Sequence, residues 1–222
     1  MPVGIGRRGL AQHRIVKHSI GAQYSVENLQ TPYNFPPGSY VFTIPRSGYW
    51  LFIAWSAGSG LGSTNAGCSG AYGEITKALL AGQTVDVKVG PEDGTSATNT
   101  ILTFPDGTVA TAVNAAADTP GTASGFDFSL SGSLGGAIGT SAGGGQGAGT
   151  GGAPGGVGSG PNAGGAGAPA RLPFRGGRGG GFRSGIGNWF RGASPGGGGS
   201  VDGTVDGDVP GGGLVLTYLV RE

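Results

Sequence analysis

The sequence predicts an all-β protein: an antiparallel β-sandwich interrupted by a long glycine-rich insertion. Short runs of β-branched and aromatic residues, bounded by Pro and Gly, recur along the first 130 residues. Helical periodicity is almost absent, and at most one short helical turn is expected, over residues 74–81. Residues 131–213 contain 35 of the 53 glycines, and an apolar segment, residues 214–220, follows them.

Six segments have the composition of β-strands. In one of them, residues 84–89, three valines alternate with polar residues that include Asp86 and Lys88, which predicts a half-buried strand. Pro105-Asp106-Gly107 separates two others and favours a tight hairpin turn. Six or seven antiparallel strands of this length pack naturally as two facing sheets. The six segments are residues 40–44, 49–55, 84–89, 100–104, 108–113 and 214–220.

The glycine-rich insertion has to leave the sheet and return to it, because the last predicted strand follows it. Glycine is the residue most costly to order, so the insertion is either disordered or held by backbone hydrogen bonds. Polyproline-II-type helices lying side by side can satisfy one another's backbone groups, and glycine at every third position lets them approach. From residue 143 to residue 167, seven of nine such positions are glycine. We therefore expect packed polyproline-II-type helices, with disorder as the alternative.

Several short motifs follow one another in a distinctive order. PGSYVFTIP at 37–45 precedes an aromatic strand and AGSG at 57–60, and then come GAYGE at 70–74, LAGQTVDVKVG at 80–90 and GGG at 211–213. This series, spanning about residues 36–222, resembles the glycine-rich domains of tailed-phage tail fibre, minor tail and tip adhesin proteins. The resemblance implies a non-enzymatic virion protein with packed glycine-rich helices topped by variable loops, and a trimeric assembly.

The chain is expected to consist of four segments with different roles. We expect an N-terminal docking arm at 1–35, β-sandwich strands at 36–130, the glycine-rich insertion at 131–213 and a closing strand at 214–222. The arm is basic and has few large apolar residues, so it should become ordered only against other virion subunits. The residues expected to dock it on the virion are Arg7, Arg8, Arg14 and Lys17.

Residues 171–191 are the expected contact surface for a host receptor or surface polysaccharide. They hold five of the thirteen basic residues, no acidic residue, and four of the five aromatic residues beyond residue 128. Guanidinium groups and rigid aromatic rings are typical anchors of binding sites. A solvated loop, a seal for the end of the helical layer and an arginine–glycine box that binds RNA are the alternatives. The expected contact residues are Arg171, Phe174, Arg175, Arg178, Phe182, Arg183, Trp189, Phe190 and Arg191.

No catalytic or cofactor site is expected. Gly-x-Ser-x-Gly occurs at 139–143 and 192–196, but the nucleophile elbow needs a following helix and a downstream histidine, whereas His13 and His18 lie upstream. The dinucleotide-type spacing of Gly147, Gly149 and Gly152 is a consequence of glycine density.

No metal site is expected either. The two histidines have no cysteine or carboxylate close to them in the sequence. Asp202, Asp206 and Asp208 lack the full pattern of a calcium loop, so we expect these three aspartates to be turn residues. Cys68 is the single cysteine; it excludes an internal disulfide, and we expect a reduced, inert side chain.

The overall charge and hydropathy argue against several classes of partner. A net charge of +1 gives no reason to expect bulk binding to nucleic acid or membranes. The longest apolar run, Trp50–Trp55, is far shorter than the roughly 20 residues of a spanning helix, and no secretory signal is expected. We expect a virion protein, assembled in the host cytoplasm, that serves as a tail-tip, fibre or minor tail protein. The alternatives are a head decoration or cement protein and, in another class, a cellular RNA-binding protein.

Overall fold

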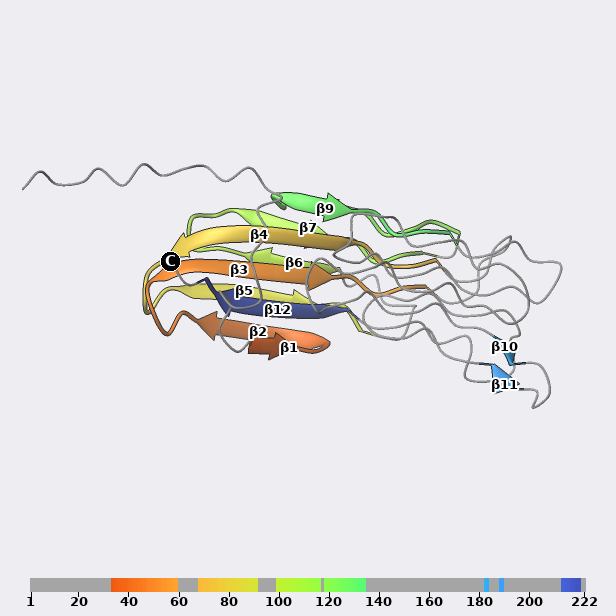
Figure 1. The fold of residues 1–222 in the computed structure, drawn as a ribbon, viewed down its shortest axis with the longest axis horizontal. Helices are drawn as coiled ribbons and strands as arrows, with labels where there is room; N and C mark the ends of the chain where they lie inside the picture. The colour runs from red at the N-terminus through yellow and green to blue at the C-terminus, as the bar shows by residue number, and fades with distance from the viewer. Residues whose placement is uncertain are drawn as a thin grey trace, which may run out of the picture.

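The computed structural model describes residues 33–59, 68–91, 99–116, 118–134 and 213–220, together with the backbone of residues 182–183 and 188–189. Within these residues the chain forms twelve strands and no helix, and every strand pairing is antiparallel. The expected all-β class is confirmed. The strands of the two large sheets run along the long axis of the described part (Figure 1).

The first large sheet, which we call sheet I, has five strands in the order β1-β12-β3-β4-β9. The C-terminal strand β12 lies between β1 and β3 and pairs with β3 along all six of its residues, from Leu214↔Trp55 to Leu219↔Trp50. The segment that follows the glycine-rich insertion is therefore an interior strand. The bounds are β1 Tyr33–Phe35, β3 Gly48–Trp55, β4 Tyr72–Leu79, β9 Phe128–Leu130 and β12 Leu214–Leu219.

The second large sheet, sheet II, has five strands in the order β2-β5-β6-β7-β8. The expected hairpin joins β6 to β7, where Phe104 N–H donates to Thr108 C=O and Gly107 N–H donates to Phe104 C=O. Gly107 has a φ of +80°, a conformation that favours glycine. The bounds are β2 Gly38–Thr43, β5 Thr84–Val89, β6 Thr100–Thr103, β7 Val109–Ala112 and β8 Ala123–Ser124.

Side chains from both sheets form one hydrophobic core. Sheet I contributes Trp50 and Phe52 of β3, and sheet II contributes the three valines of β5, which are buried while Asp86 and Lys88 are exposed. The alternation expected for residues 84–89 is confirmed. An edge-to-face contact between Phe52 and Phe104, with ring centroids 5.1 Å apart, crosses between the sheets.

Strand β3 is buried on both faces. Its residues 50–55 are each at most 1% exposed, and alternate ones belong to two different hydrophobic clusters. The second cluster lies on the other face of sheet I and contains Leu51, Ile53, Trp55, Tyr72, Leu216 and Tyr218. This double burial explains why the run Trp50–Trp55 is continuously apolar instead of alternating.

The structure corrects three expectations about secondary structure. Residues 74–81 do not form a helical turn: 74–79 belong to β4, which pairs with β3 over eight residues, and a tight turn follows at Ala81 and Gly82. Tyr33–Phe35, assigned to the docking arm, pair with β12 as β1. The short strands β8 and β9 were not expected, because two or three residues carry no readable periodicity.

Candidate functional site

Beyond the strands at one end of the sheets, several segments run on without forming strands (Figure 1). We call these segments, residues 56–59, 68–71, 113–116, 118–122 and 131–134, the coil layer. Single backbone hydrogen bonds join them laterally: Ser59 N–H donates to Cys68 C=O at 2.8 Å, and Ser69 N–H donates to Ser133 C=O at 2.9 Å. Gly121 N–H donates to Ser69 C=O at 3.0 Å, and Gly132 N–H donates to Gly121 C=O at 2.9 Å.

Buried serines complete the hydrogen bonding of the coil layer. The Ser56 hydroxyl accepts from Ala71 N–H and donates to Val113 C=O, both at 2.8 Å. The Ser69 hydroxyl accepts from Ser133 N–H at 2.8 Å. These serines are almost fully buried, and so is Cys68, the single cysteine of the chain. Backbone groups and hydroxyls, more than large apolar side chains, therefore hold this layer together.

Glycine sets the spacing of the layer. A Cβ atom added to Gly70 would lie 2.1 Å from the carbonyl oxygen of Ser56, and one added to Gly132 would lie 1.9 Å from that of Ser69. Both contacts are with backbone, which cannot rotate away. Close backbone approach and lateral hydrogen bonds therefore hold the coil layer together. The helices expected for the glycine-rich insertion lie outside the described residues, apart from the ends of the insertion at 131–134 and Gly213.

The chain re-enters sheet I at a point tied to both sheets. Gly213, directly before β12, donates its N–H to Gly90 C=O at 3.0 Å. The hydroxyl of Thr100, on β6, donates to Trp55 C=O at 2.9 Å and accepts from Gly90 N–H at 3.2 Å. The exit of the insertion at 131–134 and its return at Gly213 are therefore both anchored to ordered structure.

Three of the expected contact residues come together in a hairpin. Phe182–Arg183 form β10 and Asn188–Trp189 form β11, and the two strands pair with Phe182 opposite Trp189 and Arg183 opposite Asn188. No strand was expected in this stretch, for which the sequence predicts a contact surface, with a solvated loop as one alternative. Gly185 and Gly187, between the two strands, are a signal that indicates a hairpin connection.

The other expected site residues lie outside the described residues, so the structure places none of them. For the contact surface these are Arg171, Phe174, Arg175, Arg178, Phe190 and Arg191, and for the docking arm Arg7, Arg8, Arg14 and Lys17. His13, His18, Asp202, Asp206 and Asp208 lie outside as well. Among the residues that the structure describes, no group of three or more His, Cys, Asp or Glu side chains could hold a metal ion.

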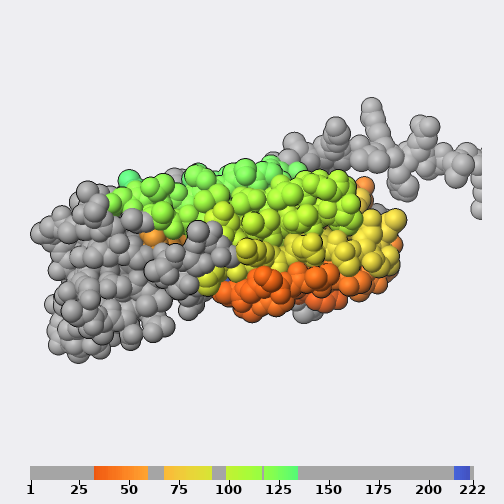
Figure 2. All heavy atoms as spheres, turned by 180° about the vertical axis from the view of Figure 1, so that it is seen from behind, coloured from red at the N-terminus to blue at the C-terminus, as the bar shows by residue number. Residues whose placement is uncertain are grey.

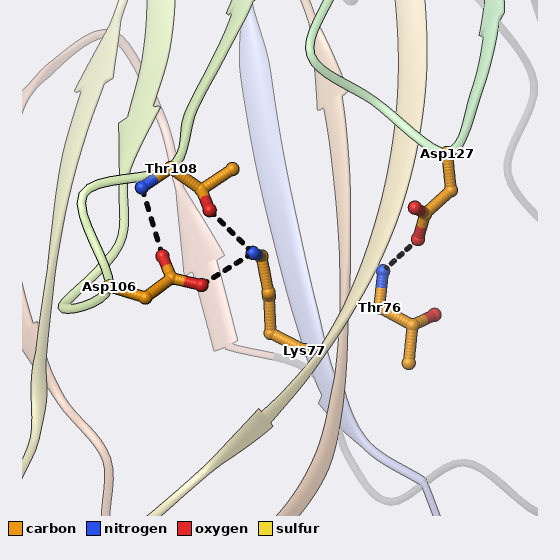
Figure 3. A network of polar contacts seen from close by, with 5 residues as sticks. All are labelled: Thr76, Lys77, Asp106, Thr108 and Asp127. Atoms are coloured by element: carbon orange, nitrogen blue, oxygen red, sulfur yellow. Dashed lines mark hydrogen bonds and ion pairs between the residues drawn. The ribbon is translucent and has the colours of Figure 1, made fainter.

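A polar cluster links the two sheets away from the coil layer (Figure 3). Lys77, on β4 of sheet I, donates to the Asp106 carboxylate at 2.8 Å and to the Thr108 hydroxyl at 2.7 Å, both in the β6–β7 turn. The other Asp106 oxygen accepts from Thr108 N–H at 2.9 Å. The hydrogen bond from Lys77, followed by those from Thr108, holds the pKa of Asp106 well below its usual range.

The Lys77 ammonium also lies 5.3 Å from the centre of the Phe104 ring. Beside it, the Asp127 carboxylate accepts from Thr76 N–H at 2.8 Å, which fixes the turn before β9 to β4 (Figure 3). Each of these groups is satisfied by neighbours that position secondary structure. We interpret the cluster as a structural link between the sheets.

No protein-family model matches this chain, and no curated protein is significantly similar to it in sequence. Across the described ranges there is no helix of sufficient length and hydrophobicity to cross a membrane.

Proposed function

We propose that the protein is a non-enzymatic structural component of a tailed-phage virion: a tail-tip, fibre or minor tail protein that attaches the particle to the host surface. The motif series between residues 37 and 90 and the Gly-Gly-Gly before the last strand suggested this function. The observation that carries it further is the position of β12, an interior strand that follows the insertion. A long segment fixed at both ends to a rigid scaffold is suited to presenting a binding surface.

The finer architecture is part of the proposal. The two sheets, which share one core, form a β-sandwich, and residues 135–212 extend the coil layer as packed polyproline-II-type helices. Support for the helices comes from the lateral hydrogen bonds of the coil layer and from the close backbone approach at Gly70 and Gly132. Such helices need neighbours for their backbone groups, and the layer offers a template for them.

The contact surface is the arginine- and aromatic-rich stretch 171–191, organised around the hairpin β10–β11. Its guanidinium groups bind phosphate or carboxylate groups of a surface polysaccharide, and its aromatic rings stack on sugar faces. The pairing of Phe182 with Trp189 supports this arrangement because it brings two of the four aromatic residues of the stretch to one place.

Adsorption of the purified protein to candidate host cells tests the contact surface. Trp189→Ala and Arg178→Ala should each weaken adsorption without changing the melting temperature, and the effect of Arg178→Ala should fade as salt rises, because exposed charges are screened. A large fall in melting temperature for Trp189→Ala, with unchanged adsorption for Arg178→Ala, would mean that the stretch is structural. Incorporation into particles without any cell binding would indicate a head decoration or cement protein instead.

Deletion of residues 2–30 tests the docking arm. The deletion ends before β1, whose first residue is Tyr33, so both sheets should still fold. We expect circular dichroism and melting temperature to be retained and incorporation into particles to be lost. Normal incorporation of the shortened chain would contradict a docking role for Arg7, Arg8, Arg14 and Lys17.

A further inference from the structure

Strand β2 is the one long edge strand among the described parts of the two large sheets. The other three edge strands, β1, β8 and β9, have two or three residues, whereas β2 has six, Gly38–Thr43. Among the strands that the structure describes, β2 pairs only with β5. Natural proteins blunt long edges with charges, prolines or bulges. Strand β2 contains no charged residue and no proline, and Val41 at its middle is 68% exposed. The residues of β1 and β2 border the visible face of the described part along its lower rim (Figure 2).

The direction of the free backbone groups follows from the β2–β5 register. Ile44 N–H donates to Gln83 C=O, so the hydrogen-bonded positions of β2, two residues apart, continue at Phe42, Tyr40 and Gly38. The N–H and C=O groups of the alternate residues Ser39, Val41 and Thr43 therefore point away from β5. These three residues are exposed, and no strand in the described part of the chain pairs with their row of donors and acceptors at the edge of sheet II.

We propose that β2 pairs antiparallel with β2 of a second copy of this chain about a two-fold axis at Val41, which joins the two copies of sheet II into one continuous sheet. Val41 is the midpoint between Pro37 and Pro45, the residues that end the donor-bearing segment on either side. Centred there, the pairing uses every outward backbone group of β2. Ser39 lies opposite Thr43 of the second copy, Val41 opposite Val41, and each of these pairs exchanges two bonds, about six in all.

In this register the side chains of β2 in one copy are complementary to those of β2 in the second copy. On the outer face the pairs are Val41 with Val41 and Ser39 with Thr43, a β-branched pair flanked by hydroxyl pairs that can hydrogen-bond. On the inner face Tyr40 lies opposite Phe42 of the second copy, and both belong to or pack against the hydrophobic core. Aromatic pairs directly opposite each other stabilise antiparallel sheets.

Charge placement permits the same pairing. In each copy Asp86 lies next to Val41 and Lys88 lies next to Ser39, one strand in from the edge. The two Asp86 carboxylates are then separated by both β2 strands, roughly three strand spacings or about 14 Å. This exceeds the Debye length of about 8 Å at physiological ionic strength, so their repulsion is screened. This interface does not depend on the proposed virion function.

The mass of the full-length protein in solution tests the proposal. We expect sedimentation equilibrium to give twice the chain mass at about 100 µM, a concentration at which even weak specific interfaces associate. A monomer at that concentration would overturn the proposal. So would a trimer, the assembly that the sequence resemblance implies.

Variants at the edge locate the interface. Val41→Pro removes an outward N–H and none of the β2–β5 hydrogen bonds, and Val41→Lys adds a charge at the centre of the edge; both should give monomers with the melting behaviour of a folded chain. Val109→Lys is the matched control, because Val109 lies in the same outer-face row as Val41, through Asp86 and Thr103, but three strands away. It should remain dimeric. Dissociation of Val109→Lys, or a dimer that survives Val41→Lys, would contradict edge pairing. If Val41→Pro fails to fold, the mass of Val41→Lys in solution still tests the edge pairing.

Amide hydrogen exchange gives a second readout that a face-to-face dimer would not produce. In the wild-type dimer the amides of Ser39, Val41 and Thr43 should be protected together with those of Tyr40 and Phe42. In Val41→Lys, protection of Ser39 and Thr43 should be lost while that of Tyr40 and Phe42 is kept. Fast exchange of Ser39 and Thr43 in the wild type at high concentration would overturn the register.

Discussion

Individual glycines decide whether the coil layer can exist. At Gly132 the backbone lies so close to that of Ser69 that a Cβ atom would fall 1.9 Å from a carbonyl oxygen. This requirement is different from that of Gly82 and Gly107, which have φ values of +85° and +80° and open space around them. Glycine serves close packing at the first site and backbone conformation at the other two.

We predict that Gly132→Ala lowers the free energy of unfolding by about 3 kcal/mol or prevents folding, because two backbones would have to separate. Gly82→Ala, where nothing lies within 4 Å of the added atom, should cost only about 1 kcal/mol from its positive φ. Urea unfolding of the two variants measures both quantities. A loss in Gly132→Ala no larger than that in Gly82→Ala would contradict the close-packed description of the coil layer.

The Asp106–Lys77 ion pair predicts a pH dependence of stability. Because the folded-state pKa of Asp106 lies below its ordinary value of 3.8, the stability that it contributes is present above about pH 4 and is lost as the pH falls through the folded-state pKa. Asp106→Asn should therefore lower the melting temperature at pH 7, and the difference from wild type should shrink towards pH 2.

Two controls accompany that prediction. In a Lys77→Met background, Asp106→Asn should have a smaller effect, since the hydrogen bond from Lys77 is the largest cause of the shift. The effect should also weaken at high salt, because the Asp106 side chain is 57% exposed and exposed pairs are screened. If the difference in melting temperature between Asp106→Asn and the wild type stays constant from pH 7 to pH 2, the ionised Asp106 carboxylate does not contribute to stability.

Among the elements, β12 has the greatest influence on the fold. It fills the space between β1 and β3, and Val215 and Leu219 contribute to the core between the sheets while Leu216 and Tyr218 belong to the cluster on the other face. An interior strand supplied from beyond the insertion makes the fold depend on contacts distant in sequence. Such contacts form slowly, because a long loop must close before they stabilise the chain.

We predict that a chain ending at residue 213 does not fold, since removal of β12 exposes both clusters and leaves the β3 edge unpaired. Thermal unfolding followed by circular dichroism should show no cooperative transition. A chain lacking only residues 221–222, beyond the end of β12, is the control and should melt like the wild type. Cooperative melting of the chain ending at 213 would mean that β12 is dispensable.

Strand β4 shows why element type is harder to predict than element position. Its sequence, YGEITKAL, has no clear alternation, and a short helical turn was the only structure that the pattern offered for residues 74–81. The strand forms because β3 provides hydrogen-bonding partners along its whole length. Tertiary pairing overrides weak local preference in this segment.

For the whole molecule, the order of the glycine-rich insertion is the main prediction. Both ends of the insertion are anchored, at 131–134 and at Gly213, and the coil layer next to it is held by lateral hydrogen bonds. Limited proteolysis under native conditions should therefore spare residues 140–170. Mass spectrometry of the fragments identifies the cut sites, and rapid cutting throughout that stretch would favour the disordered alternative.

The sequence predicted which residue types make up the candidate site but not the strand pairing within it. The sequence identified the arginines and aromatic residues of 171–191 as a contact surface, and this remains a prediction. It did not identify the pairing of Phe182 with Trp189, because strands of two residues have no periodicity of their own. The position of β2 at the edge of sheet II could not be predicted either, because the sequence of a strand does not show on which side it lacks a partner.

The sequence by itself determined the all-β class, the positions of six strands, the turn at Pro105-Asp106-Gly107 and the burial of the β5 valines. These features depend on neighbours within a few residues, where alternation and turn chemistry are decisive. Only the tertiary structure decided the strand order, the insertion of β12 beside β3 and the conversion of residues 74–79 into a strand. The same holds for the glycines at which two backbones meet. All of these features depend on contacts between segments that are distant in the sequence. The free energy of such contacts cannot be predicted from local sequence patterns.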